Sequence, residues 1–305
     1  MKEIKNIALI GLGAIGASYA AKFSDQDPRC VKIIADQARV ERLSKGIWVN
    51  NKLYNFNCVT PDQESEPADL VIIAVKFHQL EQAITDIRKH VGPDTLILSL
   101  LNGISSEEMI GRVYGMEKML YAMCIAIDAL KKGDQVRYSN FGQVHFGEVE
   151  NRKFSSKVKA VKEVFDRYQI PYVIPENMMD TLWYKFMINV GINQCSAVLK
   201  APYGIFLKVK EAGELMESAM MEVVALAQKQ GIHLEREQIN DFYQVLRTLG
   251  PENKTSMLQD VEAGRKTEVE MLGGSVCEMG KRYGVPTPVN EVLFKLIRTL
   301  EQQYR

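Results

Sequence analysis

A lysine and two asparagines spaced four residues apart are the side chains of this chain best suited to chemistry. Lys185, Asn189 and Asn193 lie within residues 183–193, a stretch that is otherwise apolar. On a helix, positions four apart fall on nearly one line, so the three would form a polar stripe on a buried segment. Burying such groups without partners costs roughly 2–7 kcal/mol each, so either an internal core network or a ligand must satisfy them. An ammonium oriented by two amides could donate a proton to a carbonyl oxygen that becomes negative during reduction.

A glycine-rich turn near the N-terminus predicts where a hydride donor would bind. The turn follows an apolar strand at residues 5–10 and opens a helix at residues 14–24. Its first glycine permits a sharp turn, its second lets the backbone approach a pyrophosphate, and its third allows close packing of helix on strand. The helix N-terminus adds partial positive charge. The predicted cofactor-binding residues of the turn are Gly11, Leu12, Gly13, Ala14, Ile15 and Gly16.

The residues after the next strands bear on the choice of cofactor. Asp36 ends the second strand, where a carboxylate usually accepts from the ribose 2′-hydroxyl of NAD(H) and repels a 2′-phosphate. Arg39, Arg42 and Lys76 are close enough in the predicted topology to supply compensating positive charge. A second interpretation makes Asp36 the N-cap of the helix that follows.

Asn102 reaches the same edge of the sheet, because it follows the next apolar strand. The pair Asn102-Gly103 is either a simple turn or a turn that projects the amide toward the nicotinamide end of a dinucleotide.

A third polar segment spans residues 255–268. Ser256 could contact a substrate or cap a helix that begins there, and Asp260 could lie in the first turn of that helix. Glu268, three helical turns on, could offer a carboxylate to substrate hydroxyls or lie on a solvated helix face.

The order of elements predicts an α/β Rossmann-type doubly wound domain at residues 1–175, followed by an all-α helical-bundle domain at residues 176–305. Continuous apolar runs at residues 69–75 and 95–101 are typical of parallel strands covered on both faces. Asn50-Asn51 predicts a hairpin at the sheet edge. Further strands are expected at residues 31–35, 120–127, 135–138, 144–147 and 172–174, and helices at 80–89, 155–168, 178–199, 211–230, 236–249 and 289–304.

The composition favours a small-molecule partner. The 38 basic residues balance 38 acidic ones, so no global field attracts nucleic acid or an anionic membrane. Neither a secretory h-region nor a membrane span is evident, and we expect a cytoplasmic protein. The five cysteines and four histidines are scattered, which argues against a disulfide framework and against a metal site.

Taken together, these motifs resemble the 2-dehydropantoate 2-reductase (ketopantoate reductase) family. The resemblance spans both expected domains in order. It depends on Gly11-x-Gly13-x-x-Gly16, Ala74-Val75-Lys76, Asn102-Gly103, Trp183-Tyr184-Lys185-x3-Asn189-x3-Asn193, Ser256-Met257-x-x-Asp260 and Thr267-Glu268. The glycine motif is common among dehydrogenases, whereas the lysine-asparagine helix and the Ser-Met-x-x-Asp segment are specific.

The resemblance implies an NADPH-dependent reduction of 2-dehydropantoate to pantoate on the route to pantothenate and coenzyme A. It implies that Lys185 is the general acid and that Glu268 binds the substrate hydroxyl, contacts the cofactor site and assists catalysis. It places Lys76 on the adenosine 2′-phosphate and the pocket in a cleft between domains. The residues implied to line the substrate and nicotinamide pocket are Asn102, Asn189, Asn193 and Ser256, the last on the carboxylate.

Alternatives to this assignment remain open. The family often carries an arginine where this chain has Asp36, so NADH is an alternative cofactor. A paralogous reductase of another 2-oxo acid would keep the same stripe, and a dinucleotide-binding sensor without turnover would keep the glycine turn. The assembly, with a homodimer as one option, is not determined by these motifs.

Overall fold

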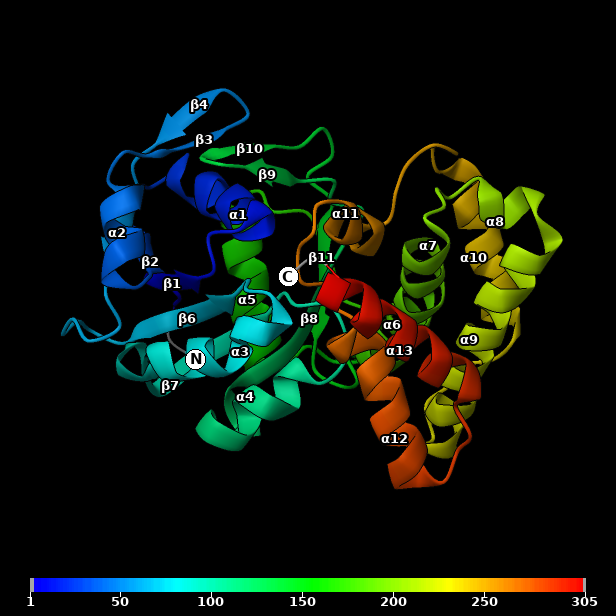
Figure 1. Cartoon of the computed structure of the whole chain (residues 1–305). Coiled ribbons are helices and arrows are strands. Elements are labelled where there is room, and N and C mark those ends of the chain that lie inside the picture. Colours follow the sequence, from blue (N-terminus) through cyan, green and yellow to red (C-terminus); the bar gives the residue numbers. More distant parts are fainter. Residues whose placement is uncertain (1–2, 304–305) are drawn as a thin grey trace. The chain divides into compact units, whose positions relative to one another are not determined.

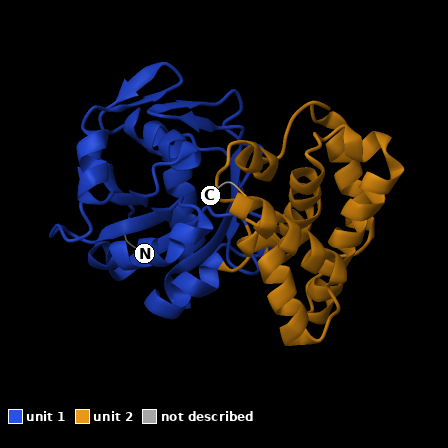
Figure 2. Cartoon of the chain, viewed as in Figure 1, with its two compact units in different colours: residues 1–102, 106–178 blue, residues 103–105, 179–305 orange. Residues whose placement is uncertain are grey.

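The structure is a computed structural model and describes residues 3–303. It divides the chain into two compact units, which Figure 2 colours separately. Unit 1 contains the chain up to Asn102 and the segment Ser106–Met178; unit 2 contains Gly103–Ser105 and the chain from Met179 onward.

An eight-stranded sheet forms the centre of unit 1 (Figure 1). The strand order is β12-β11-β8-β7-β6-β1-β2-β5, and all neighbours are parallel except β8 and β11. The strands are β1 (Ile7–Ile10), β2 (Val31–Ile34), β5 (Asn57–Val59), β6 (Ala68–Ile73), β7 (Val91–Ser99), β8 (Met119–Ile125), β11 (Gln143–Gly147) and β12 (Tyr172–Val173).

Helices cover both faces of this sheet because successive residues of each strand point to opposite sides. Leu9 and Ile72 pack in one cluster with residues of α1 and α5, and Ala8 and Val71 pack in another with residues of α3 and α4. The helices of unit 1 are α1 (Ala14–Ser24), α2 (Gln37–Leu43), α3 (Leu80–Asp86), α4 (Ser106–Tyr114) and α5 (Ser156–Arg167), with short 3-10 turns η1 (Phe77–Gln79), η2 (Arg88–His90) and η3 (Met116–Lys118). This arrangement confirms the doubly wound α/β prediction.

A second, four-stranded sheet packs on α1. Its order is β4-β3-β10-β9, with β3 (Ile47–Val49), β4 (Lys52–Tyr54), β9 (Leu130–Lys132) and β10 (Gln135–Arg137). Asn50 and Asn51 form the predicted hairpin turn with φ of 44° and 69°, values that asparagine tolerates better than most residues. The expected place of this hairpin, at the edge of the main sheet, is wrong because β3 pairs with β10 instead.

Unit 2 is a helical bundle, as predicted. Its elements are α6 (Met178–Ile188), the π-helical segment η4 (Asn189–Asn193), α7 (Gln194–Leu199), α8 (Ile205–Lys208), α9 (Lys210–Lys229), α10 (Glu237–Thr248), α11 (Ser256–Glu262), the π-helical segment η5 (Glu270–Gly274), α12 (Ser275–Tyr283) and α13 (Pro288–Gln303). The prediction of one α-helix over residues 178–199 is wrong, because η4 interrupts it with a wider turn. The sequence interpretation also missed α8, η5 and α12.

Among residues 3–303, no helix combines the length and the apolar character that crossing a membrane would require.

Candidate functional site

A cleft of about 1030 Å³ opens at the carboxyl edge of the unit 1 sheet. Its walls include Ile10 at the end of β1, Asp36 after β2, Thr60 after β5, Val75 after β6 and Gln79 of η1. The strand order reverses between β1 and β6, and open α/β sheets bind ligands at such a reversal. The cleft therefore lies where a nucleotide would bind.

The glycine turn borders this edge and has the geometry that a dinucleotide needs. Gly11 has φ of +99°, and a Cβ there would lie 2.5 Å from the carbonyl carbon of Ala74. A Cβ on Gly16 would collide with the carbonyl oxygen of Gly11. At Gly13 a Cβ would find only the Ala74 oxygen, at 4.0 Å, so this backbone is open to an approaching group.

The first turn of α1 completes the fit. Gly13 is its N-cap and supplies no side-chain oxygen to the amide groups of that turn. Such amides bind phosphate oxygens readily. Ala14 and Ile15 are the first two residues of α1, and Leu12 precedes Gly13; all three are half-buried. The residues present thus fit the pyrophosphate of a dinucleotide.

Asp36 is the N-cap of α2, so that interpretation is confirmed. Its Oδ1 accepts from the backbone N–H of Arg39 at 2.8 Å, and its Oδ2 lies 3.3 Å from Arg39 Nε. Both carboxylate oxygens are therefore engaged by the helix that Asp36 begins, while Asp36 and Arg39 also line the cleft.

Lys76 and Asn102 follow neighbouring strands and lie at the same sheet edge. Lys76 is half-buried and is the N-cap residue of η1 just after β6, and Asn102 is half-buried after β7. Gly103 turns with φ of +87°, and a Cβ there would lie 2.8 Å from Met271 Cγ. The Asn-Gly turn is thus real, and glycine is required at its second position.

The lysine-asparagine segment does not form a regular α-helical stripe. Lys185 lies in the last turn of α6, whereas Asn189 and Asn193 are the first and last residues of η4. Lys185 and Asn189 are half-buried, and Asn193 is only 8% exposed. π-Helical turns are rare and occur frequently at functional sites. The widened turn therefore falls at the residues predicted to do chemistry.

A buried polar network holds η4 in place. Gln194 Nε2 donates to the carbonyl of Val190 at 2.9 Å and to Asn290 Oδ1 at 2.8 Å. Asn290 Nδ2 in turn donates to Glu222 Oε2 at 2.7 Å. Sequence reasoning missed these residues, although a glutamine next to Asn193 in an apolar stretch was a usable signal.

Close packing on α9 also fixes this segment. A Cβ on Gly191 would lie 2.5 Å from Met220 Cγ, so only glycine lets η4 approach α9 this closely.

Glu268 does not lie on the helix that begins at Ser256, so the predicted helical placement is wrong. Helix α11 ends at Glu262, and Glu268 is a half-buried residue just before η5. The preceding Thr267 is 3% exposed, and its N–H and Oγ1 donate to Glu301 Oε1 at 2.7 and 2.6 Å. This contact ties the Glu268 segment to α13.

Two expectations for α11 are corrected. Thr255, not Ser256, caps the helix by accepting from Leu258 N–H at 3.2 Å, and Ser256 is an exposed residue of the first turn. Asp260 lies beyond the first turn, where its buried carboxylate pairs with Arg265 Nε at 2.8 Å.

Packing within unit 2 brings these segments into one neighbourhood. Helix α11 contacts η4, and η4 contacts η5. The elements that carry Ser256, Asn189 and Asn193 and the element that follows Glu268 are therefore adjacent in this unit. Among the described residues, no three His, Cys, Asp or Glu side chains gather as metal ligands would.

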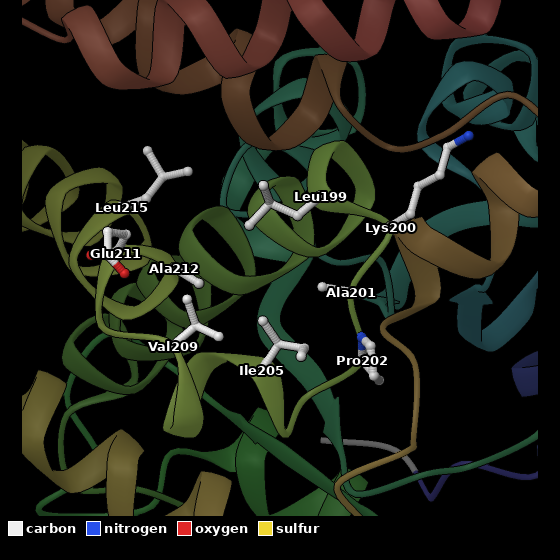
Figure 3. Close-up of a pocket in the computed structure, with 9 residues that line it drawn as sticks. All are labelled: Leu199, Lys200, Ala201, Pro202, Ile205, Val209, Glu211, Ala212 and Leu215. Carbon is white, nitrogen blue, oxygen red and sulfur yellow. The ribbon is translucent and has the colours of Figure 1, made fainter.

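A second hollow in unit 2, of about 530 Å³, carries none of the predicted site residues (Figure 3). It lies between the segment that follows α7 and the helices α8 and α9, and most of its walls are aliphatic. Its lining residues are Leu199, Lys200, Ala201, Pro202, Ile205, Val209, Glu211, Ala212 and Leu215.

Comparison with known proteins gives the same family for both halves of the chain. Residues 7–151 match the family described as "Ketopantoate reductase PanE/ApbA", and residues 177–301 match "Ketopantoate reductase PanE/ApbA C terminal". The 2-dehydropantoate 2-reductase of Vibrio cholerae is 28% identical over 98% of this chain and 99% of its own. That of Aquifex aeolicus is 26% identical over 98% and 97%.

Solved structures share the fold across nearly the whole chain. D-mandelate dehydrogenase in a ternary complex with NADH and anilino(oxo)acetate has a TM-score of 0.84 at 25% identity, covering 98% of this chain and 99% of that one. A dimeric ketopantoate reductase from Staphylococcus aureus has a TM-score of 0.83 at 22% identity, covering 98% and 100%.

Proposed function

Because this chain belongs to the ketopantoate reductase family, we propose that it reduces 2-dehydropantoate to pantoate with NADPH. The family assignment makes it an oxidoreductase with a dinucleotide-binding fold. Family members depend on NAD(P)H, and solved structures that share this fold contain NADH. The proposal that the substrate is 2-dehydropantoate depends on the placement of Lys185, Asn189 and Asn193 around a π-helical turn. The chain that carries them matches the N-terminal and C-terminal models of the family in order. We place the reaction in the cytoplasm, on the route to pantothenate and coenzyme A.

Lys185 is the proposed general acid. A bound reduced nicotinamide supplies the hydride to the carbonyl carbon, and the oxygen then needs a proton. The lysine ammonium is a donor with three N–H groups, so it can stabilise the developing negative charge and donate that proton. Its half-buried position in the last turn of α6 supports this role, because a partly desolvated ammonium interacts more strongly with a nearby oxyanion.

The neighbouring polar residues are proposed to position the substrate. Asn189 and Asn193 offer amide donors and acceptors that do not compete for the transferred proton. Glu268 accepts from the substrate hydroxyl, and the exposed Ser256 hydroxyl donates to its carboxylate. The adjacency of α11, η4 and η5 supports a common pocket for these groups.

The cofactor is proposed to bind unit 1 through the glycine turn, with Asn102 at its nicotinamide end and Lys76 at its 2′-phosphate. The engagement of both Asp36 oxygens by Arg39 supports NADPH, because it offsets the charge that would repel the 2′-phosphate. NADH remains the alternative donor, as in the complex of D-mandelate dehydrogenase.

One optical assay tests the proposal. We expect purified protein to oxidise NADPH when 2-dehydropantoate is added, faster than with NADH at equal concentration. Turnover well above that on simple 2-oxo acids supports the substrate assignment. Faster turnover with NADH would contradict the NADPH assignment and the role of Lys76.

The same assay, together with a nucleotide-binding titration, distinguishes two other functions. The likeness to D-mandelate dehydrogenase favours, as second candidate, a paralogous reductase of another 2-oxo acid. Rates on 2-dehydropantoate no better than on 2-oxo acid analogues would support it. Tight NADPH binding without oxidation on any 2-oxo acid would instead indicate a dinucleotide sensor.

We also propose a homodimer, by analogy with the dimeric Staphylococcus aureus enzyme. Light scattering that gives the mass of one chain would contradict it.

A further inference from the structure

A lysine outside the family motifs lies on the glycine turn. Lys131 belongs to β9, and its Nζ donates to the carbonyl oxygen of Leu12 at 2.6 Å. Leu12 is the residue between the first two glycines of the turn. The ammonium of Lys131 therefore reaches the backbone that the dinucleotide would approach.

The strand register explains why Lys131, and not its neighbour, points this way. Lys131 pairs with Val136 across the β9–β10 hairpin, and directly paired residues of antiparallel strands share a face. Val136 is 1% exposed and packs against α1 with Ala17 and Ala21. Lys131 is thus on the α1 side of the hairpin, which Figure 1 shows beside that helix.

Lys132 lies on the opposite face of the same strand. It pairs with Gln135, and both residues are exposed. Successive residues of a strand alternate between faces, so Lys132 carries the same charge one position away without facing α1.

Positive charge gathers around the ammonium of Lys131. Although the residue as a whole is exposed, burial of the ammonium lowers its pKa, and the charges of Arg39 and Arg42 lower it further, against a small opposing effect of Asp134. Arg39 also lines the nucleotide cleft and pairs with Asp36. Leu43 of α2 and Leu12 pack against the same apolar cluster as Val136, so the helix that carries Arg39 and Arg42 adjoins this hairpin. An anion bound beside these cations would lessen their mutual repulsion.

The position of Lys131, Arg39 and Arg42 indicates which anion they would bind. These cations lie between the glycine turn and α2, whose N-cap is Asp36, and this region faces the adenosine ribose in dinucleotide-binding folds. We propose that Lys131 determines cofactor specificity by binding the adenosine 2′-phosphate of NADPH. This inference rests on the proposed use of NADPH and adds a residue to the 2′-phosphate site.

Equilibrium binding of NADPH and NADH to three variants tests it. Lys131→Met keeps most of the apolar stem and removes the charge, Lys131→Arg keeps the charge, and Lys132→Met is the matched control. We expect Lys131→Met to weaken NADPH binding about tenfold, as for the loss of one charge-assisted hydrogen bond, and to leave NADH binding nearly unchanged. Lys131→Arg should retain most of the preference, and Lys132→Met should match the original protein.

Two outcomes would overturn the inference. Equal weakening of NADPH and NADH would assign Lys131 to the pyrophosphate or to a structural tether on Leu12. Unchanged NADPH affinity in Lys131→Met would remove any role in binding. Neither outcome depends on substrate, so protein that binds NADPH but does not reduce 2-dehydropantoate would contradict the proposed function and leave this inference standing.

Amine labelling of the unsubstituted protein gives a second readout that does not depend on how the variants fold. We expect 2′,5′-ADP to protect Lys131 from an amine-reactive reagent more than 5′-ADP does, with Lys132 as the internal reference in the same peptide. Equal protection by the two nucleotides would contradict the proposal.

Discussion

Gln194 donates from its side-chain amide to Oδ1 of Asn290 at 2.8 Å, which ties the helix that follows η4 to α13. Asn290 Nδ2 in turn donates to Oε2 of Glu222, on α9, at 2.7 Å. The π-helical turn that carries Asn189 and Asn193 is therefore fixed by residues that need not touch any ligand.

Replacing Asn290 by alanine should loosen this turn. We expect the free energy of unfolding to fall by about 2 kcal/mol or more, because the buried Gln194 amide and Glu222 carboxylate lose a partner. The turnover number should fall about tenfold or more through misplacement of the polar groups on η4, with NADPH affinity retained. Urea unfolding, steady-state kinetics and nucleotide titration measure the three quantities. Gln302→Ala, an exposed change on the same helix, is the control; full turnover in a destabilised Asn290→Ala would show that the network does not position the site.

The fold of unit 1 was predictable because its strands are buried on both faces. The sequence of such a strand is an unbroken run of apolar residues. The ends of β1 and β6 lie within two residues of the ends predicted from that pattern. The Asn50-Asn51 turn was predictable from residue type. The pairing of its strand β3 with β10 was not, since that contact joins segments more than eighty residues apart and depends on packing against α1.

The candidate site was predictable in residue type but not in backbone form. The four-residue spacing of Lys185, Asn189 and Asn193 predicted that they lie close together. The helix propensities of these residues do not distinguish a π-helical turn from an α-helical one. The wider turn depends on tertiary contacts, including the close approach of Gly191 to Met220 and the Gln194 network. The prediction that Glu268 lies on a helix was wrong for a related reason. The hydrogen bonds from Thr267 to Glu301 hold its segment, in place of the backbone hydrogen bonds of an α-helix.

Lys185→Ala should remove the proposed proton donor. We expect the turnover number to fall by about 10² or more, in the lower range for loss of a general acid, with NADPH affinity nearly intact. Lys208→Ala removes an exposed lysine from α8 of the same unit and should change neither quantity. If Lys185→Ala protein keeps its activity, Lys185 has only a structural role.

Glu268→Ala should impair both the affinity for 2-dehydropantoate and its turnover, because the proposed carboxylate would hold the substrate hydroxyl through the reaction. We expect about a tenfold or larger fall in kcat/KM, the effect of one hydrogen bond to a charged group. Glu278→Ala, an exposed glutamate on α12, is the matched control. Loss of folded protein, read by circular dichroism, would instead make Glu268 a core residue.

Glu107 should make the stability of unit 1 depend on pH. This residue of α4 is 2% exposed, and burial raises the pKa of its carboxyl to about 7, against the opposing hydrogen bond from Ser106 Oγ at 2.9 Å. A pKa raised in the folded state favours the protonated form. The contribution to stability is therefore complete below the unfolded pKa of about 4.5 and is lost as the pH rises through about 7.

The shift corresponds to roughly 3 kcal/mol across that window. We therefore expect Glu107→Gln to gain stability relative to the original protein as the pH rises from about 5 to about 8, because a neutral amide carries no charge to bury. Urea unfolding at several pH values measures the difference. Glu108→Gln, the exposed neighbour that pairs with Arg112, should show no comparable trend. Parallel pH profiles for the original protein and Glu107→Gln would mean that the Glu107 carboxyl ionises as readily in the folded chain as in the unfolded one.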